Sequence, residues 1–362
     1  MMSIKVAILG AGNMGTALAQ ILAKRGHRVA LWDYQPRTIE IMTRTRKNEE
    51  FLPGIKLSKR VAPEASMQNA IEGARLIIIA CASPYIRATT KHLAHCLGSP
   101  PLKIRGDGGV MTGPIIAHVA KGLEEKTFLT MHEVVQSELP PAFRKNVVTI
   151  SGPSIASELV RDIPTAVVAA SQNKQASGFV QSAFNSPTFK VALSTDYRGV
   201  SVCGALKNVY AIALGMCDGY TRNNTKNGLR PDTKDHERGL PMNMKAFMLT
   251  VALHEMEKVV SALGGKRETV YGLAGIGDMI VTGFGNGRNR ALGERICKDG
   301  HCKFIWQKDT PTVEGVAATK AFYELTRHKK LATPLINLVY RVLYKSADPC
   351  VSITKFFATV KL

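Results

Sequence analysis

The chain has 362 residues, of which 45% are hydrophobic, and this is enough for about two domains with buried cores. Dominant intrinsic disorder is therefore excluded. Lys and Arg number 48 against 28 Asp and Glu, and the net charge of +20 creates a field that attracts phosphates, acidic metabolites, nucleic acid or anionic membranes.

The first half of the chain alternates short apolar runs with helical patterns. The runs are IKVAILG, RVALWD, LIIIACA, IIAHVA, NVVTISG, TAVVAA and FKVALS. Because they are apolar throughout, instead of at every second residue, they predict strands buried on both faces of a mostly parallel sheet. We therefore expect an α/β domain over residues 1–194, a Rossmann-like doubly wound sheet that binds a dinucleotide.

A glycine motif follows the first of these runs. Gly10, Gly12 and Gly15 stand between the run IKVAIL and the helical pattern TALAQILAKRG. In this context Gly10 permits a tight turn, Gly12 lets backbone approach a pyrophosphate, and Gly15 allows close packing of helix on strand. Asp33 ends the second run about 20 residues later, where a carboxylate accepts ribose hydroxyls and repels a 2′-phosphate. The motif predicts NAD as the cofactor, and the nearby Arg37 keeps NADP open as the alternative.

The second half of the chain has a different texture. Long helical patterns cover 200–217, 244–263, 289–299 and 313–328, and few strand candidates remain. These patterns predict an all-α substrate or catalytic domain over residues 195–362. The stretch 218–243 is polar and carries Gly, Asn and Pro, so we expect a long loop there.

Two lysines are candidate functional residues. Lys207 is the only charged residue in the apolar pattern 200–217. Helices that are apolar all round are buried, and an interior ammonium is costly unless it is paired, so Lys207 is a candidate proton donor or acceptor. The alternative is a lysine that reaches the surface along its stem. Lys121 follows the run PIIAHVA, and the carboxyl ends of strands line the ligand crevice of open α/β sheets, although a solvated lysine there is equally compatible.

A third group of candidates lies in the segment 272–296. Asp278 and Thr282 are four residues apart and share one face if the segment is helical, although Asp278 could also be a helix N-cap. The glycine-rich loop that follows leads into a helix that starts near Arg288 and Asn289. Exposed N–H groups, a helix dipole and a guanidinium together suit a phosphate, and the alternative is a flexible loop with incidental basic residues.

Together these segments resemble the soluble NAD(P)-dependent glycerol-3-phosphate dehydrogenase family. The matching pieces occur in the family's order and are GAGNMGTALA, AKGLE, SGPSIASELVRDIPTAVV, CGALKNVYAIALGMCDG, GLAGIGDMIVT, GNGRNRALGE and VEGV. The resemblance implies reversible hydride transfer between NAD(P) and sn-glycerol 3-phosphate or dihydroxyacetone phosphate, in phospholipid precursor synthesis. It also implies a homodimer.

The resemblance assigns further site residues. The implied catalytic residues are Lys207, Lys121, Asp278 and Thr282. The implied substrate-binding residues are Lys121, Gly152, Ser154, Asp278, Gly287, Arg288 and Asn289. The implied cofactor contacts are Gly10, Gly12, Asn13, Met14, Gly15, Asp33, Lys121, Ala156, Arg288 and Glu314. No metal is expected.

The chain also departs from the family's pattern. Cys81-Ala82-Ser83 stands where the family has Val-Pro-Ser, Met14 replaces an aromatic residue, and Val251 replaces an arginine. The segments 97–114 and 218–243 are longer than usual. Because loops near a cleft change the ligand of a fold, a related dehydrogenase for another phosphorylated or anionic substrate remains the alternative function.

Location and partners follow from composition. Seven scattered cysteines without a CxxC pair, no signal-peptide pattern, and no apolar run of membrane-spanning length indicate a cytoplasmic protein. The basic residues are dispersed and form no recognised nucleic-acid-binding pattern, so we expect a small phosphorylated substrate and no nucleic acid. The charge alone supports the rival from another class, a non-catalytic nucleotide- or nucleic-acid-binding protein.

Overall fold

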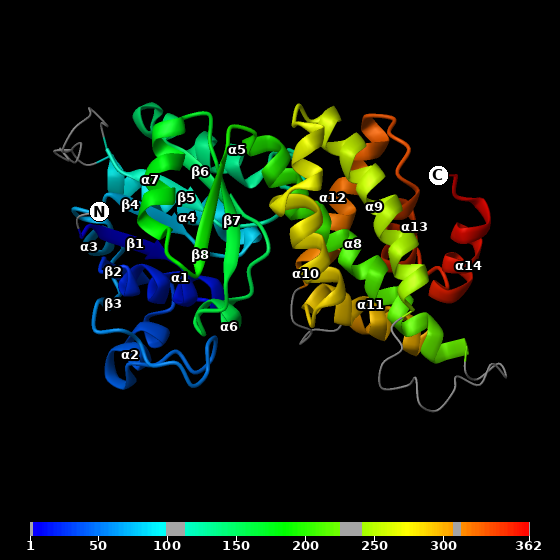
Figure 1. Cartoon of the computed structure of the whole chain (residues 1–362), viewed down its shortest axis with the longest axis horizontal. Helices are drawn as coiled ribbons and strands as arrows, with labels where there is room; N and C mark the ends of the chain where they lie inside the picture. The colour runs from blue at the N-terminus through cyan, green and yellow to red at the C-terminus, as the bar shows by residue number, and fades with distance from the viewer. Residues whose placement is uncertain (1–2, 99–112, 225–240, 307–312, 362) are drawn as a thin grey trace. The chain divides into compact units, whose positions relative to one another are not determined.

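The computed structural model describes residues 3–98, 113–224, 241–306 and 313–361 (Figure 1). The chain forms two compact units, Met1–Glu124 with Leu129–Ser201, and Glu125–Phe128 with Val202–Leu362. We call them the sheet unit and the helical unit. The boundary expected at residue 194 coincides with the end of the last strand, whereas the compact units divide within the first turns of the helix that follows.

The sheet unit contains a sheet whose strands, over the described residues, run in the order β3-β2-β1-β4-β5-β6-β7-β8. Their bounds are β1 (Lys5–Leu9), β2 (Arg28–Trp32), β3 (Val61–Glu64), β4 (Leu76–Ile79), β5 (Ile115–His118), β6 (Val147–Ser151), β7 (Thr165–Ala170) and β8 (Phe189–Ser194). Neighbouring strands are parallel except β6 and β7, which pair antiparallel. The expected doubly wound, mostly parallel sheet is confirmed.

Helices cover both faces of this sheet. They are α1 (Asn13–Lys24), α2 (Pro36–Thr45), α3 (Met67–Ile71), α4 (Ile86–Leu97), α5 (Met131–Glu138), α6 (Ala156–Leu159) and α7 (Lys174–Phe184). Val6 and Ile8 of β1 belong to a core with α1 and α7, whereas Ala7 and Leu9 belong to a core with α3, α4 and α5. Successive residues point to opposite faces, and both faces are buried, so the strands read as continuous apolar runs.

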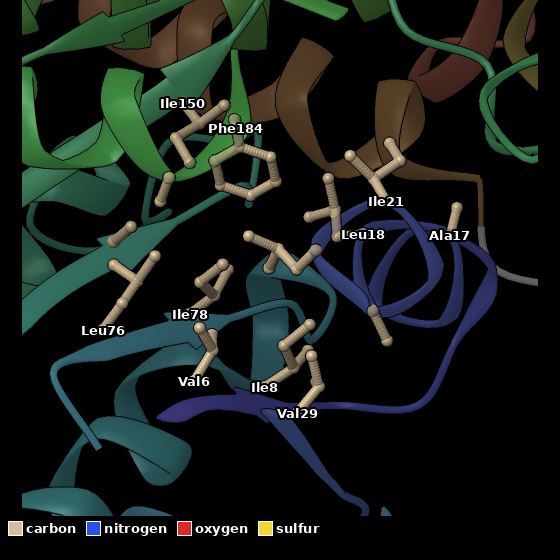
Figure 2. Close-up of a cluster of buried hydrophobic side chains, with 14 of the residues drawn as sticks. Val6, Ile8, Ala17, Leu18, Ile21, Val29, Leu76, Ile78, Ile150 and Phe184 are labelled. Atoms are coloured by element: carbon tan, nitrogen blue, oxygen red, sulfur yellow. The ribbon is translucent and has the colours of Figure 1, made fainter. Parts of the chain in front are cut away.

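Figure 2 shows part of the first core. Ala17, Leu18 and Ile21 of α1 lie near strand residues such as Ile8, with Phe184 of α7 beside them. This packing fixes the start of α1, and therefore the glycine turn, against the carboxyl end of β1.

Among the described residues, the helical unit contains the four long helices expected from the sequence, and three more. Its helices are α8 (Tyr197–Asn224, which begins in the sheet unit), α9 (Met242–Ala262), α10 (Asp278–Phe284), α11 (Arg288–Asp299), α12 (Glu314–His328), α13 (Pro334–Tyr344) and α14 (Pro349–Thr359). Among the described residues, one helix segment, Tyr197–Tyr220, is long and apolar enough to span a membrane, but its apolar window is entirely buried within the protein. Core helices have the same composition, so α8 is a core helix of this kind.

The expected loop at 218–243 is corrected at both of its ends. Residues 218–224 continue α8, and α9 already begins at Met242, while 225–240 lie outside the described residues. The helix continues because Asp218 is neutralised inside the unit, where its carboxylate accepts hydrogen bonds from Lys245 at 3.0 Å and Arg290 at 2.7 Å. A paired carboxylate can stay in a buried helix, and sequence pattern alone does not reveal such a partner. The segment 97–114 lies almost wholly outside the described residues.

Candidate active site

The glycine turn forms where β1 leads into α1. Gly10 has φ +117°, and a Cβ there would lie 2.9 Å from the backbone nitrogen of Cys81. A Cβ on Gly15 would overlap the carbonyl oxygen of Gly10, so both positions require glycine for the packing of the protein itself. Gly12 is different, because a Cβ there would meet no described protein atom within 4 Å. That open space at a helix N-terminus is what a pyrophosphate needs in order to approach backbone N–H groups.

Asp33 lies beside this turn. Its carboxylate accepts a hydrogen bond from the backbone N–H of Ala11 at 2.7 Å and another from that of Gln35 at 3.0 Å. The carboxylate therefore holds the glycine turn and keeps a negative charge at the end of β2. Arg37 lies nearby in sequence, at the start of α2, and is exposed.

A cavity of about 440 Å³ lies next to Asp33. Its lining includes Gly10, Gly12, Trp32, Asp33, Tyr34, Cys81 and Tyr85. The exposed rings of Tyr34 and Tyr85 are stacked with centroids 6.4 Å apart. Burial raises the pKa of the Cys81 thiol, so this departure from Val-Pro-Ser places a neutral thiol in the wall. Mostly apolar walls with one carboxylate suit the adenosine half of a dinucleotide, so the residues present fit NAD(P).

Three other predicted residues gather at the carboxyl ends of β5 and β6. The Lys121 ammonium donates a hydrogen bond to the carbonyl oxygen of Gly152 at 3.2 Å, and the Ser154 hydroxyl donates to the same oxygen at 3.2 Å. Gly152 has φ +129°, and a Cβ there would lie 3.1 Å from the Cα of Val167. The strand-end position of Lys121 thus has a structural basis, because parallel strands bring these residues to one edge.

Three further predicted cofactor residues of the sheet unit lie at the start of α1 and of α6. Asn13 is exposed at the start of α1, and Met14 is partly buried against the core. Ala156 begins α6 and also packs against that core.

Lys207 forms the centre of a buried cluster in the helical unit. Its side chain is 10% exposed, and Nζ donates to Asp278 Oδ1 at 2.6 Å and to Thr282 Oγ1 at 2.7 Å. The Thr282 hydroxyl in turn donates to the backbone carbonyl of Asp278 at 2.7 Å. The ammonium is therefore paired inside the protein, and Asp278, 1% exposed, binds Lys207 instead of capping a helix.

The backbone before Asp278 explains its position. Leu273–Gly277 forms a π-helical turn, and a Cβ on Gly275 would overlap the carbonyl of Val270. Such turns are frequent at functional sites because the extra residue redirects the side chains that follow. Here the turn is followed directly by Asp278 and α10.

A second polar chain passes through Asn208, which the sequence analysis did not single out. Asn208 Nδ2 donates to Glu314 Oε2 at 3.3 Å, and Asn289 Nδ2 donates to Asn208 Oδ1 at 2.9 Å. The backbone N–H of Gly315 donates to Asn289 Oδ1 at 2.9 Å. The chain links α8, α11 and α12 and holds Asn289 and Glu314 in place. In the sequence, this chain of hydrogen bonds was indicated by the Asn208 amide, which follows Lys207 in an otherwise apolar helix.

Arg288 occupies the first position of α11, directly after Gly287. Its side chain is exposed and has no partner among the residues that the structure describes. Helix and guanidinium together present positive charge at this end of α11, as phosphate binding requires. Across the described ranges, no three His, Cys, Asp or Glu side chains gather as metal ligands.

The fold and these clusters define a Rossmann-type dinucleotide-dependent oxidoreductase. Residues 5–177 match the family described as "NAD-dependent glycerol-3-phosphate dehydrogenase N-terminus". Residues 196–232 and 234–354 match the family described as the C-terminus of the same enzyme. The chain belongs to this family.

Individual relatives agree with this assignment. The chain is 34% identical over 346 residues to a glycerol-3-phosphate dehydrogenase (NAD(P)+) of Geobacter sp. strain M21, covering 95% of this chain and 94% of the relative. A crystal structure of glycerol-3-phosphate dehydrogenase from Coxiella burnetii is similar with a TM-score of 0.83 and 31% identity, covering 99% of both chains. The yeast enzyme structure is similar in fold, with a TM-score of 0.77 at 20% identity and coverage of 99% of this chain and 100% of that one.

Proposed function

We propose that the protein interconverts sn-glycerol 3-phosphate and dihydroxyacetone phosphate with NAD(H) as the preferred cofactor. The observation that carries the proposal is the buried contact of Lys207 with Asp278 and Thr282 in a member of this family. When bound, the nicotinamide supplies or accepts the hydride at C2 of the substrate.

Lys207 is the proposed proton donor and acceptor for the C2 oxygen. Its ammonium has three protons, and Asp278 and Thr282 take two of them. These two bonds fix the position of Nζ, from which Lys207 would contact the C2 oxygen. During ketone reduction Lys207 would stabilise the developing alkoxide and protonate it, and during oxidation it would take the hydroxyl proton back.

Asp278 and Thr282 are proposed to position Lys207. The carboxylate keeps an ammonium stable where Lys207 is only 10% exposed. The Thr282 hydroxyl donates to backbone and can therefore only accept from Lys207, which fixes the direction of the hydrogen bond.

The substrate phosphate is assigned to the start of α11. Gly287, Arg288 and Asn289 offer backbone N–H groups, a guanidinium without an acidic partner among the described residues, and an amide held by Asn208. Lys121, Gly152 and Ser154 are proposed to contact the substrate from the sheet unit, where Lys121 would assist electrostatically. Binding the remote phosphate orients C2 and can be expressed as rate in the chemical step.

The cofactor is assigned to the glycine turn. Gly10, Gly12 and Gly15 shape the turn for the pyrophosphate, and Asp33 favours ribose hydroxyls over a 2′-phosphate. Asn13, Met14 and Ala156 of the sheet unit and Arg288 and Glu314 of the helical unit are proposed as further contacts, as is Lys121.

We further propose a cytoplasmic homodimer that binds no nucleic acid. The scattered cysteines and the burial of the apolar helix α8 support the location, and the family resemblance supports the dimer.

The proposal is tested by following NADH oxidation with dihydroxyacetone phosphate, unphosphorylated dihydroxyacetone and a set of carboxylated ketones as substrates. We expect dihydroxyacetone phosphate to give the highest kcat/KM and dihydroxyacetone to be a very poor substrate. A carboxylated ketone with the highest kcat/KM would establish the alternative dehydrogenase, and no turnover with any of them would favour the non-catalytic binding protein.

A further inference from the structure

The antiparallel strand β7 gives the sheet a second edge with carboxyl ends. Ser151, the last residue of β6, pairs with Val168, and Thr149 pairs with Ala170, the last residue of β7. Strand β8 runs parallel to β7. The carboxyl ends of β7 and β8 therefore lie on the edge opposite the glycine turn, beside the amino end of β6. Ligands in open α/β sheets bind outside carboxyl ends, so this edge is a second candidate location.

A cavity of about 350 Å³ lies at this edge. Ser171, Gln172 and Asn173 follow β7 and line it, and Tyr197 lines it after β8. The rest of its lining comes from α5 and from the turn before β6, and consists of His132, Gln136, Arg144 and Lys145. The volume is within the range of small-molecule sites and exceeds what a lone inorganic ion fills.

Two lining residues with buried rings each carry a polar atom that bonds to no described residue. His132 and Tyr197 are 1% and 8% exposed and stack with centroids 4.1 Å apart. His132 Nδ1 lies 2.9 Å from the Thr149 hydroxyl, but Nε2 has no partner among the described residues. The Tyr197 hydroxyl likewise has none within the described ranges. Both residues line the cavity, so these two atoms can hydrogen-bond to a molecule that enters it.

The charged groups of the lining are both cationic. Arg144 uses Nε to donate to the carbonyl of Leu139 at 2.9 Å, which leaves both terminal nitrogens without a partner in the described part of the chain. Lys145 makes no ion pair there either, and no carboxylate lines the cavity. Helix α7 contributes through its dipole alone, because Asn173 Oδ1 already accepts from the N–H groups of Gln175 and Ala176.

We propose that this cavity is a second ligand site, which binds a small phosphate monoester. The phosphate lies at Arg144 and Lys145, and the organic part lies against His132 and Tyr197. A guanidinium and an ammonium without acidic neighbours suit a phosphate, and His132 Nε2 and the Tyr197 hydroxyl suit the oxygens of its organic part. The site is separate from the proposed dehydrogenase site and does not depend on that activity.

The test uses the full-length protein with labelled histidine rings and inorganic phosphate as the probe. The ring signal of His132 is assigned by its loss in His132→Gln. We expect phosphate to shift this signal in the wild type, relative to chloride at the same ionic strength. In the double variant Arg144→Gln/Lys145→Gln the apparent Kd should rise at least about tenfold, because each charge-assisted hydrogen bond contributes more than that factor.

Two further variants separate the possible causes. Lys59→Gln/Lys190→Gln removes the same charge from exposed positions of the sheet unit and should retain the wild-type Kd. Arg288→Gln weakens phosphate binding at the proposed substrate site and should leave the His132 shift intact. The proposal is overturned if phosphate does not move the His132 signal, if the double variant titrates like the wild type, or if Arg288→Gln abolishes the shift. Unchanged signals of the other histidines show that each variant is folded.

Discussion

Lys207 and Asp278 are 71 residues apart in the chain, yet Nζ of the lysine lies 2.6 Å from Oδ1 of the aspartate. The helical unit contains a second buried pair of the same kind, Lys245 with Asp218 at 3.0 Å. The two pairs differ in surroundings. Lys245 is completely buried, and its ammonium also lies 4.5 Å from the ring centre of Phe284, whereas Lys207 keeps 10% exposure. Of these two lysines, Lys207 is therefore the one whose exposure is compatible with the proposed contact to a substrate.

This contrast gives a matched pair of variants. Lys207→Met should lower kcat by at least about 10²-fold, the usual contribution of acid–base catalysis, while NADH binding stays near the wild-type value. Lys245→Met should instead destabilise the protein by about 1.5–3 kcal/mol, because it removes the charge-assisted bonds of Lys245 to Asp218 while Arg290 still pairs with that carboxylate, and the folded fraction should keep its kcat. Initial rates and thermal unfolding measure both effects. Retained turnover in Lys207→Met would remove this residue from the mechanism.

Asp33 should control the choice between NADH and NADPH. Asp33→Asn keeps an oxygen for the N–H of Ala11 but removes the charge that repels a 2′-phosphate, so the preference for NADH should narrow. The measurement is the ratio of kcat/KM with NADH to kcat/KM with NADPH, and this ratio should fall in the variant. If the wild type already prefers NADPH and Arg37→Gln abolishes that preference, the exposed Arg37 and not Asp33 selects the cofactor.

Arg288 should serve the substrate phosphate by geometry as well as by charge. Arg288→Lys keeps the charge but loses the bidentate fork, so kcat/KM should fall far more with dihydroxyacetone phosphate than with dihydroxyacetone. Arg295→Lys, on the same helix and 59% exposed, is the control and should change neither value. If Arg288→Lys lowers kcat/KM by the same factor with both substrates, this residue contacts the cofactor alone.

Two buried histidines of the sheet unit should make stability depend on pH. His118 Nε2 and His132 Nδ1 both contact the Thr149 hydroxyl, at 2.8 Å and 2.9 Å. Burial lowers the pKa of His118 to about 4 and that of His132 well below its usual value. The unfolded chain takes up these protons near pH 6.5, so stability is fully present above that pH and falls as the pH drops toward 4.

The measurement is the thermal midpoint between about pH 7.5 and about pH 5, in the wild type and in His118→Gln. Below its unfolded pKa, one histidine changes the free energy of unfolding by about 1.4 kcal/mol per pH unit. The thermal midpoint of the variant should therefore fall less steeply than that of the wild type as the pH is lowered. The same slope in both proteins would show that His118 is not neutral and buried as described.

The sequence predicted those features that local patterns determine. Continuous apolar runs predicted most of the strands, and the glycine spacing predicted the turn that the φ of Gly10 and the overlap at Gly15 require. Strand β3, Val61–Glu64, was missed because four residues with a proline at an edge do not form an apolar run.

Other features depend on contacts between distant residues. The antiparallel entry of β7 leaves no local signal, since a buried strand reads alike in either direction. The spacing of Asp278 and Thr282 predicted a shared face, but only the fold shows that Lys207 contacts both. Asn208 was missed for the same reason, because its role lies in its bonds to Glu314 and Asn289.

The central claim is that hydride passes between the nicotinamide and C2 of a three-carbon phosphate, with Lys207 handling the proton. The most direct measurement uses NADH that is deuterated at the nicotinamide carbon from which the hydride is transferred. Dihydroxyacetone phosphate is the substrate, and the product is analysed by NMR. We predict sn-glycerol 3-phosphate with deuterium at C2 from the wild type, and a rate at least about 10²-fold lower from Lys207→Met. Oxidation of the deuterated cofactor without deuterium at C2 of glycerol phosphate, or equal rates from the two proteins, would contradict the claim.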